Sequence, residues 1–295
     1  MARSGAPVPE PALSPVERCA ATDIAAIVDA LRRSGGVVVR QLLSADETTQ
    51  LHDELEPHVE RRQPGFRGDS FYGSHTVRVQ GLAAKSRTFV DSVLLNPTLL
   101  AVADAVLLAN SGHYWMSQAE TIYIRPGNTA QALHRDDVNW TYAARLGIDL
   151  QVSALVALGD YDAEVGATMV VPGSHRGGYD APIDASAAAP VEMERGDALI
   201  YLGSLAHGGG ANTSTGRVRK ALYIGYLLGW LTPEEAVVHS VPEDLARSLP
   251  PQARALLGWA NLHGNATTEG VEAATQLWQL DHDRFEQYDG TFLHR

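Results

Sequence analysis

The stretch from Tyr114 to about Trp230 restricts the possible folds of this chain more than any other feature. It consists of short segments rich in Val, Ile, Tyr and Leu, separated by Gly, Pro, Asn and Asp. The segments that we expect to form strands are residues 121–124, 150–158, 168–171, 198–202 and 220–228. Strands at this spacing, without helical patterns between them, are typical of an antiparallel barrel or sandwich. The sequence therefore predicts a β core.

Helical patterns flank this β segment on both sides. Apolar residues from Ile24 to Leu31 recur with the period of an amphipathic helix, and a short strand should follow at residues 37–39. A second helix should begin at the capping residue Ser44 and end or kink at Pro57. A third is expected over residues 99–108, and further helices and loops after residue 231. The expected fold class is mainly β with flanking helices.

Composition limits the kinds of partner. The chain has 295 residues, with 23 Lys and Arg against 35 Asp and Glu, which gives a formal net charge of −12. Nucleic acids and anionic membranes attract clustered positive charge, so neither is expected as a partner. No apolar run approaches the length of a membrane span. We expect a cytoplasmic protein.

The single cysteine and the N-terminal prolines give two further expectations, one about metal ligands and one about domain organisation. Cys19 is the only cysteine in the chain, so a metal would have to be held by His, Asp or Glu. Residues 1–15 contain four prolines among small residues and predict a flexible lead. Residues 16–295 are then expected to form a single domain.

One short motif is suited to metal chemistry. In extended backbone the side chains of His134 and Asp136 project to the same side, where an imidazole and a carboxylate can reach one ion. His207 follows another expected strand and is the best candidate for a third ligand. Two imidazoles and one carboxylate are the ligand set of non-haem Fe(II) oxygenases. Alternatively, Asp136 lies in a solvated turn and only orients His134 through a hydrogen bond.

Several motifs occur together in a characteristic order. They are Gln131-x-x-His134-Arg135-Asp136-Asp137, Gly166-Ala167-Thr168, Pro172-Gly173-Ser174-His175, His207 with Asn212, and Arg219-Lys220-Ala221-Leu222. Over roughly residues 20–230 the chain resembles the phytanoyl-CoA dioxygenase family of Fe(II)- and 2-oxoglutarate-dependent oxygenases. Within that family it looks similar to the branch that acts on natural products. The resemblance implies a double-stranded β-helix, which is a cupin-like jelly-roll barrel.

The resemblance also implies the cofactors and their ligands. His134, Asp136 and His207 would hold Fe(II), which would use 2-oxoglutarate and O2 as cosubstrates. The far carboxylate of 2-oxoglutarate would meet Arg219, with Arg217 as the rival, because a guanidinium can take a carboxylate through two parallel hydrogen bonds.

The resemblance implies roles at two further positions and limits the type of reaction. Gln131 and Thr168 match polar positions that help to hold the cosubstrate in similar enzymes. Related halogenases carry Gly or Ala where this chain has Asp136, so halogenation is not expected. The reaction would be hydroxylation, desaturation, epoxidation or rearrangement at an unactivated carbon, with release of succinate and carbon dioxide.

Some aromatic residues could line a substrate pocket, although aromatic residues in strands more often belong to the core. The candidates are His75, Tyr72, Trp140 and Tyr226. Residues 60–80 and the region after Leu231 are candidate lids. The C-terminal region could instead contact a second subunit, which makes a homodimer possible.

Other readings have less support. The string His207-Gly208-Gly209-Gly210 resembles an oxyanion-hole motif, but no serine lies in the Gly-x-Ser-x-Gly context that a serine hydrolase needs. A catalytically silent jelly roll that binds a small molecule stays open as an alternative. We expect His175 to be a turn residue bonded to backbone and Asp137 to be a solvated or supporting carboxylate. We expect the run Asp281-His282-Asp283 to lie on a charged surface helix.

Overall fold

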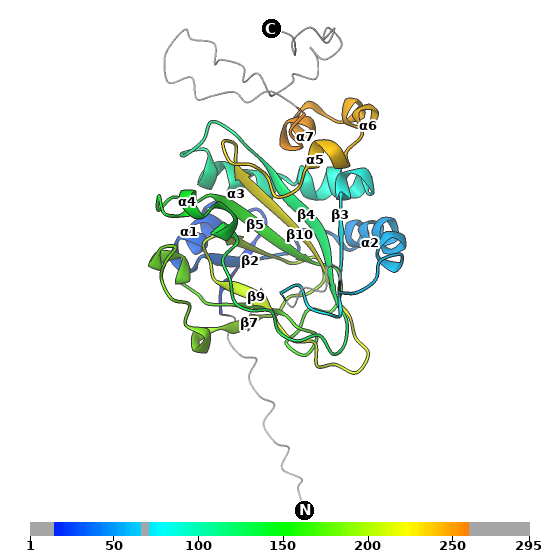
Figure 1. The fold of residues 1–295 in the computed structure, drawn as a ribbon. Coiled ribbons are helices and arrows are strands. Elements are labelled where there is room, and N and C mark those ends of the chain that lie inside the picture. The colour runs from blue at the N-terminus through cyan, green and yellow to red at the C-terminus, as the bar shows by residue number, and fades with distance from the viewer. Residues whose placement is uncertain (1–14, 66–70, 260–295) are drawn as a thin grey trace, which may run out of the picture.

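The computed structural model describes residues 15–65 and 71–259, which form two sheets with helices packed outside them (Figure 1). The larger sheet has the strand order β1-β2-β8-β5-β10-β4-β3, and the smaller one has the order β7-β6-β9. The strands of the larger sheet are β1 (Glu17–Ala20), β2 (Gly36–Arg40), β3 (Thr76–Gln80), β4 (Tyr114–Ile124), β5 (Gln151–Ala157), β8 (Ala198–Leu202) and β10 (Arg219–Leu228). Those of the smaller sheet are β6 (Thr168–Val170), β7 (Ala189–Val191) and β9 (His207–Gly209).

The predicted fold class is confirmed, with one refinement. Every strand pair is antiparallel except β1 with β2. The two sheets stay separate instead of closing into a continuous barrel, which leaves an arrangement of the jelly-roll type. All five strands expected in the β segment are present, but β4 begins seven residues before the expected start at residue 121. The short strands β1, β3, β7 and β9 were not expected.

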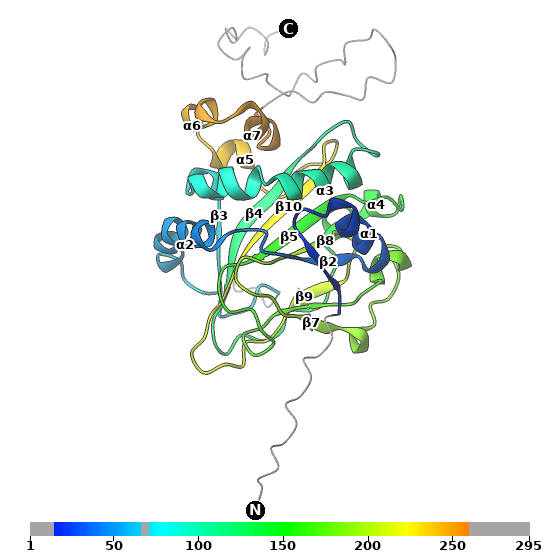
Figure 2. The same ribbon diagram turned by 180° about the vertical axis from the view of Figure 1, so that it is seen from behind.

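Helices cover the outer face of the large sheet (Figure 2). The main ones are α1 (Ile24–Ser34), α2 (Ala45–Glu60) and α3 (Pro97–Leu107), and the shorter ones are α4 (Thr141–Ala144), α5 (Val237–Ser240), α6 (Glu243–Ser248) and α7 (Pro251–Leu256). No helix among the described residues is long and apolar enough to cross a membrane.

The start of α2 confirms the predicted capping box, and the helix continues past Pro57, where it was expected to end or kink. The Ser44 hydroxyl accepts from the Glu47 N–H, and the Glu47 carboxylate accepts from the Ser44 N–H. Pro57 does not end the helix, which continues to Glu60. Pro57 is exposed near the last turn, and Val59 beyond it is buried. Packing of this last turn therefore outweighs the hydrogen bond that proline removes.

Side chains alternate along β10 between two apolar cores. Leu222, Ile224 and Tyr226 pack between the large sheet and the helices. Ala221 and Tyr223 belong to the core that faces the small sheet. This alternation follows from the period of two in a strand, and both faces of β10 are buried because it is a central strand. The inner face is the one that can carry a site.

Candidate metal centre

Two histidines that are distant in the sequence lie side by side because their backbones pair. The N–H of His134 donates to the carbonyl of His207, and the N–H of His207 donates to the carbonyl of His134, both at 2.9 Å. They form an isolated antiparallel bridge, and β9, which begins at His207, is paired with β6 on its other side. The relative position of the two imidazoles is thus fixed by main-chain hydrogen bonds.

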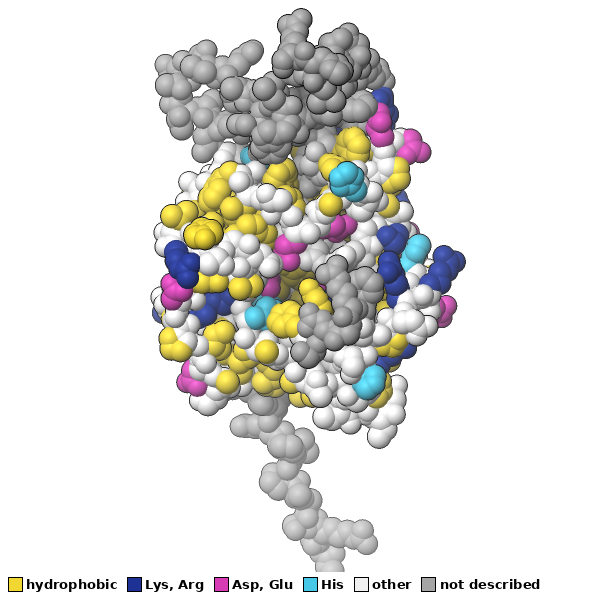
Figure 3. All heavy atoms as spheres, viewed as in Figure 1, with side chains coloured by type: hydrophobic (Ala, Val, Ile, Leu, Met, Phe, Trp, Pro, Cys, Tyr) yellow, Lys and Arg dark blue, Asp and Glu magenta, His cyan; other side chains and the backbone are white. Residues whose placement is uncertain are grey.

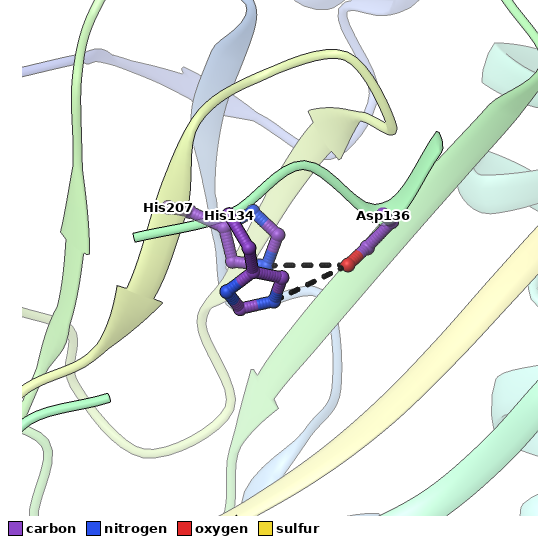
Figure 4. A group of neighbouring side chains, drawn as sticks. All are labelled: His134, Asp136 and His207. Atoms are coloured by element: carbon purple, nitrogen blue, oxygen red, sulfur yellow. Dashed lines mark ion pairs between the residues drawn. The ribbon is translucent and has the colours of Figure 1, made fainter. Parts of the chain in front are cut away.

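Three candidate ligand atoms converge at this bridge. The Nε2 atoms of His134 and His207 lie 3.6 and 3.5 Å from Oδ1 of Asp136 (Figure 4). One ligand atom from each residue lies within 4.8 Å of the others. The backbone at Arg135 is extended, as predicted, while Asp136 begins a short 3-10 helix over Asp136–Trp140. The alternative interpretation was a solvated turn in which Asp136 only orients His134; instead Asp136 is partly buried, and its Oδ1 faces both imidazoles across the pocket.

Backbone carbonyls orient both imidazoles. Nδ1 of His134 lies 3.0 Å from the carbonyl of Ala132, and Nδ1 of His207 lies 3.1 Å from that of Leu205. A carbonyl only accepts, so each Nδ1 carries the proton and each Nε2 presents a lone pair toward Asp136. Burial, together with the neighbouring His207, lowers the pKa of His134 to about 4. Both features favour the neutral imidazole that a metal ion requires.

Three hydroxyl groups hold the other oxygen of Asp136. Oδ2 accepts from Tyr201 at 3.1 Å, from Ser153 at 3.4 Å and from Tyr223 at 3.5 Å. Gln151 donates in turn to the hydroxyls of Ser153 and Tyr223. With Oδ2 engaged on this side, Oδ1 is directed at the two imidazoles. This supporting set was missed from the sequence, since its members lie on β5, β8 and β10 and only the tertiary structure brings them to Asp136.

The three residues line one pocket between the two sheets. Alternate residues of β4 face it, as expected for one face of a strand. The other lining residues come from neighbouring strands and loops. The lining includes Phe71, Tyr72, Arg78, Gln118, Glu120, Ile122, Ile124, Gln131, Val138, Asn139, Leu155, Thr168, Tyr201, Arg219, Tyr223 and Glu234. In the space-filling view, acidic and histidine side chains gather beside apolar ones near the middle of this face (Figure 3).

The structure separates the two arginine candidates. Arg219 lines the pocket and is only 2% exposed. Its Nη1 donates to the carbonyl of Gly166 at 3.0 Å, and its guanidinium lies 5.0 Å from the centre of the Tyr161 ring. Among the described residues no carboxylate forms an ion pair with it. Burying an unpaired cation is costly, so this arrangement calls for an anion from outside the chain.

Arg217 is in a different environment. It is partly exposed and does not line the pocket, and its guanidinium pairs with the carboxylates of Asp160, Asp162 and Glu164. Its charge is therefore already compensated on the surface. Of the two arginines, only Arg219 lies where it could meet a bound anion.

Both polar candidates for cosubstrate binding line the same pocket. Oε1 of Gln131 accepts from the N–H of Gly209 at 3.1 Å. The hydroxyl of Thr168 shares a hydrogen bond of 2.7 Å with the hydroxyl of Tyr161. Each has a protein partner, as a polar group at a strand edge would, and each also borders the cavity near Arg219.

Three of the four aromatic substrate candidates, His75, Trp140 and Tyr226, do not line the pocket. Tyr226 is 1% exposed on the outer face of β10, and its hydroxyl donates to the carbonyl of Leu94 at 2.9 Å. Tyr223, three residues earlier on the inner face, lines the pocket instead. His75 is exposed and does not border the pocket, whereas Tyr72 does. Alternation along β10 could have favoured Tyr223, but the sequence did not say which face of the strand is inward.

The remaining candidate residues make structural contacts and do not line the pocket. Nε2 of His175 lies 3.2 Å from the carbonyl of Arg32, which agrees with the expected backbone-bonded turn residue. Trp140 donates to the carbonyl of Thr232 and does not border the pocket. Asp137 is 3% exposed, so it is not solvated as one reading had it, and burial raises its pKa to about 8. Residues 1–14 and the run Asp281-His282-Asp283 lie outside the described residues.

The donor set suits Fe(II). Two imidazole nitrogens and one carboxylate oxygen, with open space beside them, match the ligand set of non-haem Fe(II) oxygenases. The hydrogen bonds from the imidazoles and to Oδ2 of Asp136 are the outer contacts that fix ligand orientation at metal sites.

Comparison with curated proteins gives relatives that align over most of both chains. The chain is 36% identical over 261 residues to the dioxygenase ALT11 of Alternaria alternata, covering 82% of this chain and 86% of the relative. It is 31% identical over 267 residues to the dioxygenase aneA of Aspergillus aculeatus, covering 86% and 87% of the two chains.

Solved structures share the fold at lower identity. The 2-oxoglutarate-dependent epimerase SnoN from nogalamycin biosynthesis is 21% identical and superposes with a TM-score of 0.55 over 77% of this chain and 90% of its own. HygX from Streptomyces hygroscopicus, solved with nickel, 2-oxoglutarate and hygromycin B, is 20% identical with a TM-score of 0.56 over 70% and 88%. The family model for phytanoyl-CoA dioxygenase matches residues 31–221. The chain therefore belongs to the phytanoyl-CoA dioxygenase family and is a dioxygenase, as its motifs predicted.

Proposed function

We propose that this dioxygenase uses Fe(II), 2-oxoglutarate and O2 to oxidise an unactivated C–H bond of a small molecule. The observation that carries the proposal is the convergence on a single pocket of three ligand atoms and one buried arginine that forms no ion pair within the described part of the chain. The presence of 2-oxoglutarate in the solved structure of HygX agrees with it.

The pocket offers a place for each cofactor. His134, Asp136 and His207 would hold the iron through two Nε2 atoms and Oδ1. Arg219 would take the far carboxylate of 2-oxoglutarate, with Gln131 and Thr168 beside it. When bound, iron and 2-oxoglutarate supply the oxidising power, drawn from O2 with release of succinate and carbon dioxide.

The residues of the chain contribute position and charge. Tyr201, Ser153 and Tyr223 keep Oδ1 of Asp136 facing the imidazoles. The cation of Arg219 offsets the dianionic cosubstrate in a chain whose net charge is −12. The side chains of Phe71, Tyr72 and Val138 border the cavity and would exclude water from a bound substrate.

The substrate class and the type of reaction are inferred by analogy with the relatives. SnoN is described as an enzyme of nogalamycin biosynthesis. By analogy this chain would act on an intermediate of a secondary metabolite, by hydroxylation or by a related desaturation, epoxidation or rearrangement. Asp136 occupies the position that halogenases leave to a small residue, so chlorination is not proposed. We further propose that residues 16–295 form one domain, that the enzyme is cytoplasmic and possibly homodimeric, and that it binds neither nucleic acid nor membrane.

Conversion of 2-oxoglutarate to succinate tests the proposal. The enzyme should form succinate when Fe(II), O2 and an extract or library of small metabolites are present, and each omission should abolish it. His134→Ala should lose both iron binding and turnover, whereas His75→Ala, at an exposed histidine outside the pocket, should keep both. A protein that binds neither iron nor 2-oxoglutarate, with His134→Ala unchanged in either assay, would instead be the silent small-molecule binder.

A further inference from the structure

The metal and cosubstrate sites leave one acidic side chain of the pocket unassigned. Glu234 lies in the loop that joins β10 to α5 and lines the pocket, where its side chain is exposed. Ser117 donates weakly to its Oε1 at 3.5 Å, and Asn139 donates to the same carboxyl group. Within residues 15–65 and 71–259, Glu234 forms no ion pair. A carboxylate that faces a pocket without a cation beside it is available to a ligand.

Hydrogen bonds on both sides of Glu234 fix the loop. Nε1 of Trp140 donates to the carbonyl of Thr232 at 2.9 Å. The N–H of Glu235 donates to the carbonyl of Ser117 at 2.8 Å. The main chain that carries Glu234 is therefore held in place before a substrate arrives, which lowers the entropic cost of binding.

Glu234 and Arg219 lie at different ends of the pocket. Gln118, the neighbour of Ser117 on β4, lines the pocket, and its carboxamide makes no hydrogen bond to any described residue. Arg219 is opposite Ile124 in the ladder of β4 with β10, six residues beyond Gln118, which corresponds to about 20 Å of strand. Two polar groups without a charged partner thus meet at the end far from Arg219.

The metal centre lies between these two ends. Tyr223, whose hydroxyl reaches Asp136, is directly opposite Glu120 in the same ladder. Along β4, Glu120 is two residues from Gln118 and four from the residue opposite Arg219. A substrate group beside Gln118 would therefore lie across the metal centre from the carboxylate that Arg219 holds.

Charge balance decides which group suits this end. When iron and 2-oxoglutarate are bound, the charges of Fe(II), Asp136, Arg219 and the dianionic cosubstrate cancel. Arg78 and Glu120 add one charge of each sign. Among the described residues that line the pocket, only Glu234 then has a charge that is not compensated. A cationic group on a substrate would neutralise it, whereas an anionic group would be repelled.

The surroundings of Glu234 agree with a cationic ligand. Although the side chain is exposed at the pocket, nearby protein removes part of its water. This desolvation, followed by the charges of Asp136 and Glu120, raises the pKa of the Glu234 carboxyl group to about 7. An ammonium group beside the carboxylate would counter both effects, because it favours the ionised form.

We propose that Glu234 and Gln118 determine substrate specificity by binding a protonated amine on the substrate. An ammonium group has three N–H donors, which the Glu234 carboxylate and the carboxamide oxygen of Gln118 can accept. Phe71, Val138 and Leu155 line the same pocket and would contact an apolar remainder of the molecule. The proposal rests on the function proposed above, because it assigns the substrate side of the same pocket.

Three probes on one carbon skeleton test the proposal. They are 2-cyclohexylethylamine, 2-cyclohexylethanol and cyclohexylacetate, titrated anaerobically at neutral pH into enzyme loaded with Fe(II) and 2-oxoglutarate and followed by saturation-transfer NMR. The wild-type enzyme should bind the amine at least about tenfold more tightly than the alcohol, which corresponds to about 1.4 kcal/mol. The carboxylate should bind most weakly.

Changes at Glu234 should alter this order. Glu234→Gln keeps the shape of the side chain and removes its charge, so the amine should lose its advantage over the alcohol. Glu234→Lys should bind the carboxylate most tightly, a gain that a misfolded protein cannot show. Glu243→Gln is the matched control, since it breaks the surface pair of Glu243 with Arg247 outside the pocket and should keep the wild-type order.

A change at Gln118 should act on hydrogen bonding and not on charge. Gln118→Leu should weaken the amine and the alcohol alike, by about twofold to tenfold, because the carboxamide oxygen accepts from either group. Unchanged binding of both probes would refute the role of Gln118.

The outcomes separate this inference from the function on which it rests. Binding of 2-oxoglutarate to the metal-loaded enzyme is measured first by calorimetry, and its absence refutes the proposed function whatever the probes do. If 2-oxoglutarate binds but the wild-type enzyme does not prefer the amine, or Glu234→Gln keeps that preference, the specificity role of Glu234 is wrong. Failure of every probe to bind the loaded wild-type enzyme also overturns it.

Discussion

Arg219 and Arg217 lie two residues apart, yet their environments differ. Arg219 is inside the pocket and has no carboxylate partner among residues 15–65 and 71–259, whereas Arg217 is on the surface among three carboxylates. Both arginines were candidates in the sequence, because a small error in the strand register would exchange them. The pairing of Arg219 with Ile124 on β4 settles which one faces the cavity.

Replacing Arg219 should therefore affect one ligand and not the other. Arg219→Ala should weaken 2-oxoglutarate binding by about tenfold to a hundredfold, since a charge-assisted hydrogen bond contributes about 1.5–3 kcal/mol. Iron affinity should change little, because Arg219 contacts none of the three metal ligands. Calorimetry with each ligand checks this, and Arg217→Ala is the matched control. Equal losses for iron and 2-oxoglutarate would count against the assignment.

The hydroxyl of Tyr201 should matter for metal binding. Tyr201→Phe removes the shortest hydrogen bond to Oδ2 of Asp136 and keeps the ring that packs 4.5 Å from His207. Loss of such an outer contact typically costs about tenfold to a hundredfold in metal affinity. Competitive titration with a metal chelator measures it. Tyr226→Phe, in the outer core, should leave metal affinity unchanged, and an equal loss there would indicate a general effect of removing a buried hydroxyl.

At the level of elements, local signals were predictable and strand pairing was not. The amphipathic helix α1, the capping box of α2 at Ser44 and the extent of β8 follow from short sequence patterns. Three of the unexpected strands, β1, β7 and β9, have only three or four residues and form because neighbouring strands are present. The same reason explains the wrong choice of Tyr226, since the inward face of β10 depends on its partners β4 and β5.

The turn between α1 and β2 is an element that should not tolerate a side chain. Gly35 ends α1 with φ of 83°, and a Cβ there would lie 2.6 Å from Nδ1 of His175 and 2.9 Å from Cδ1 of Leu205. Gly35→Ala should lower the free energy of unfolding by about 1–2 kcal/mol for the left-handed backbone alone. Chemical denaturation checks this. Gly216→Ala is the control, since its Cβ would meet nothing within 4 Å, and an equal loss there would contradict the steric account.

For the whole molecule, ligand binding and stability should be linked. Iron and 2-oxoglutarate bind only the folded pocket, so each at a hundredfold excess over its Kd should stabilise the protein by about 2.7 kcal/mol. For a chain of this size, 1 kcal/mol raises Tm by about 2–4 °C. Anaerobic thermal melts measure the increase, which His134→Ala should abolish for iron. If neither ligand changes the Tm of the wild-type enzyme, the pocket binds neither of them.

The most direct test of the central claim is a crystal structure of the enzyme prepared anaerobically with Fe(II) and 2-oxoglutarate. The account predicts one iron bound by Nε2 of His134, Nε2 of His207 and Oδ1 of Asp136, with the far carboxylate of 2-oxoglutarate against Arg219. Iron bound elsewhere, or 2-oxoglutarate bound away from Arg219 while the three residues stand as they do here, would contradict it.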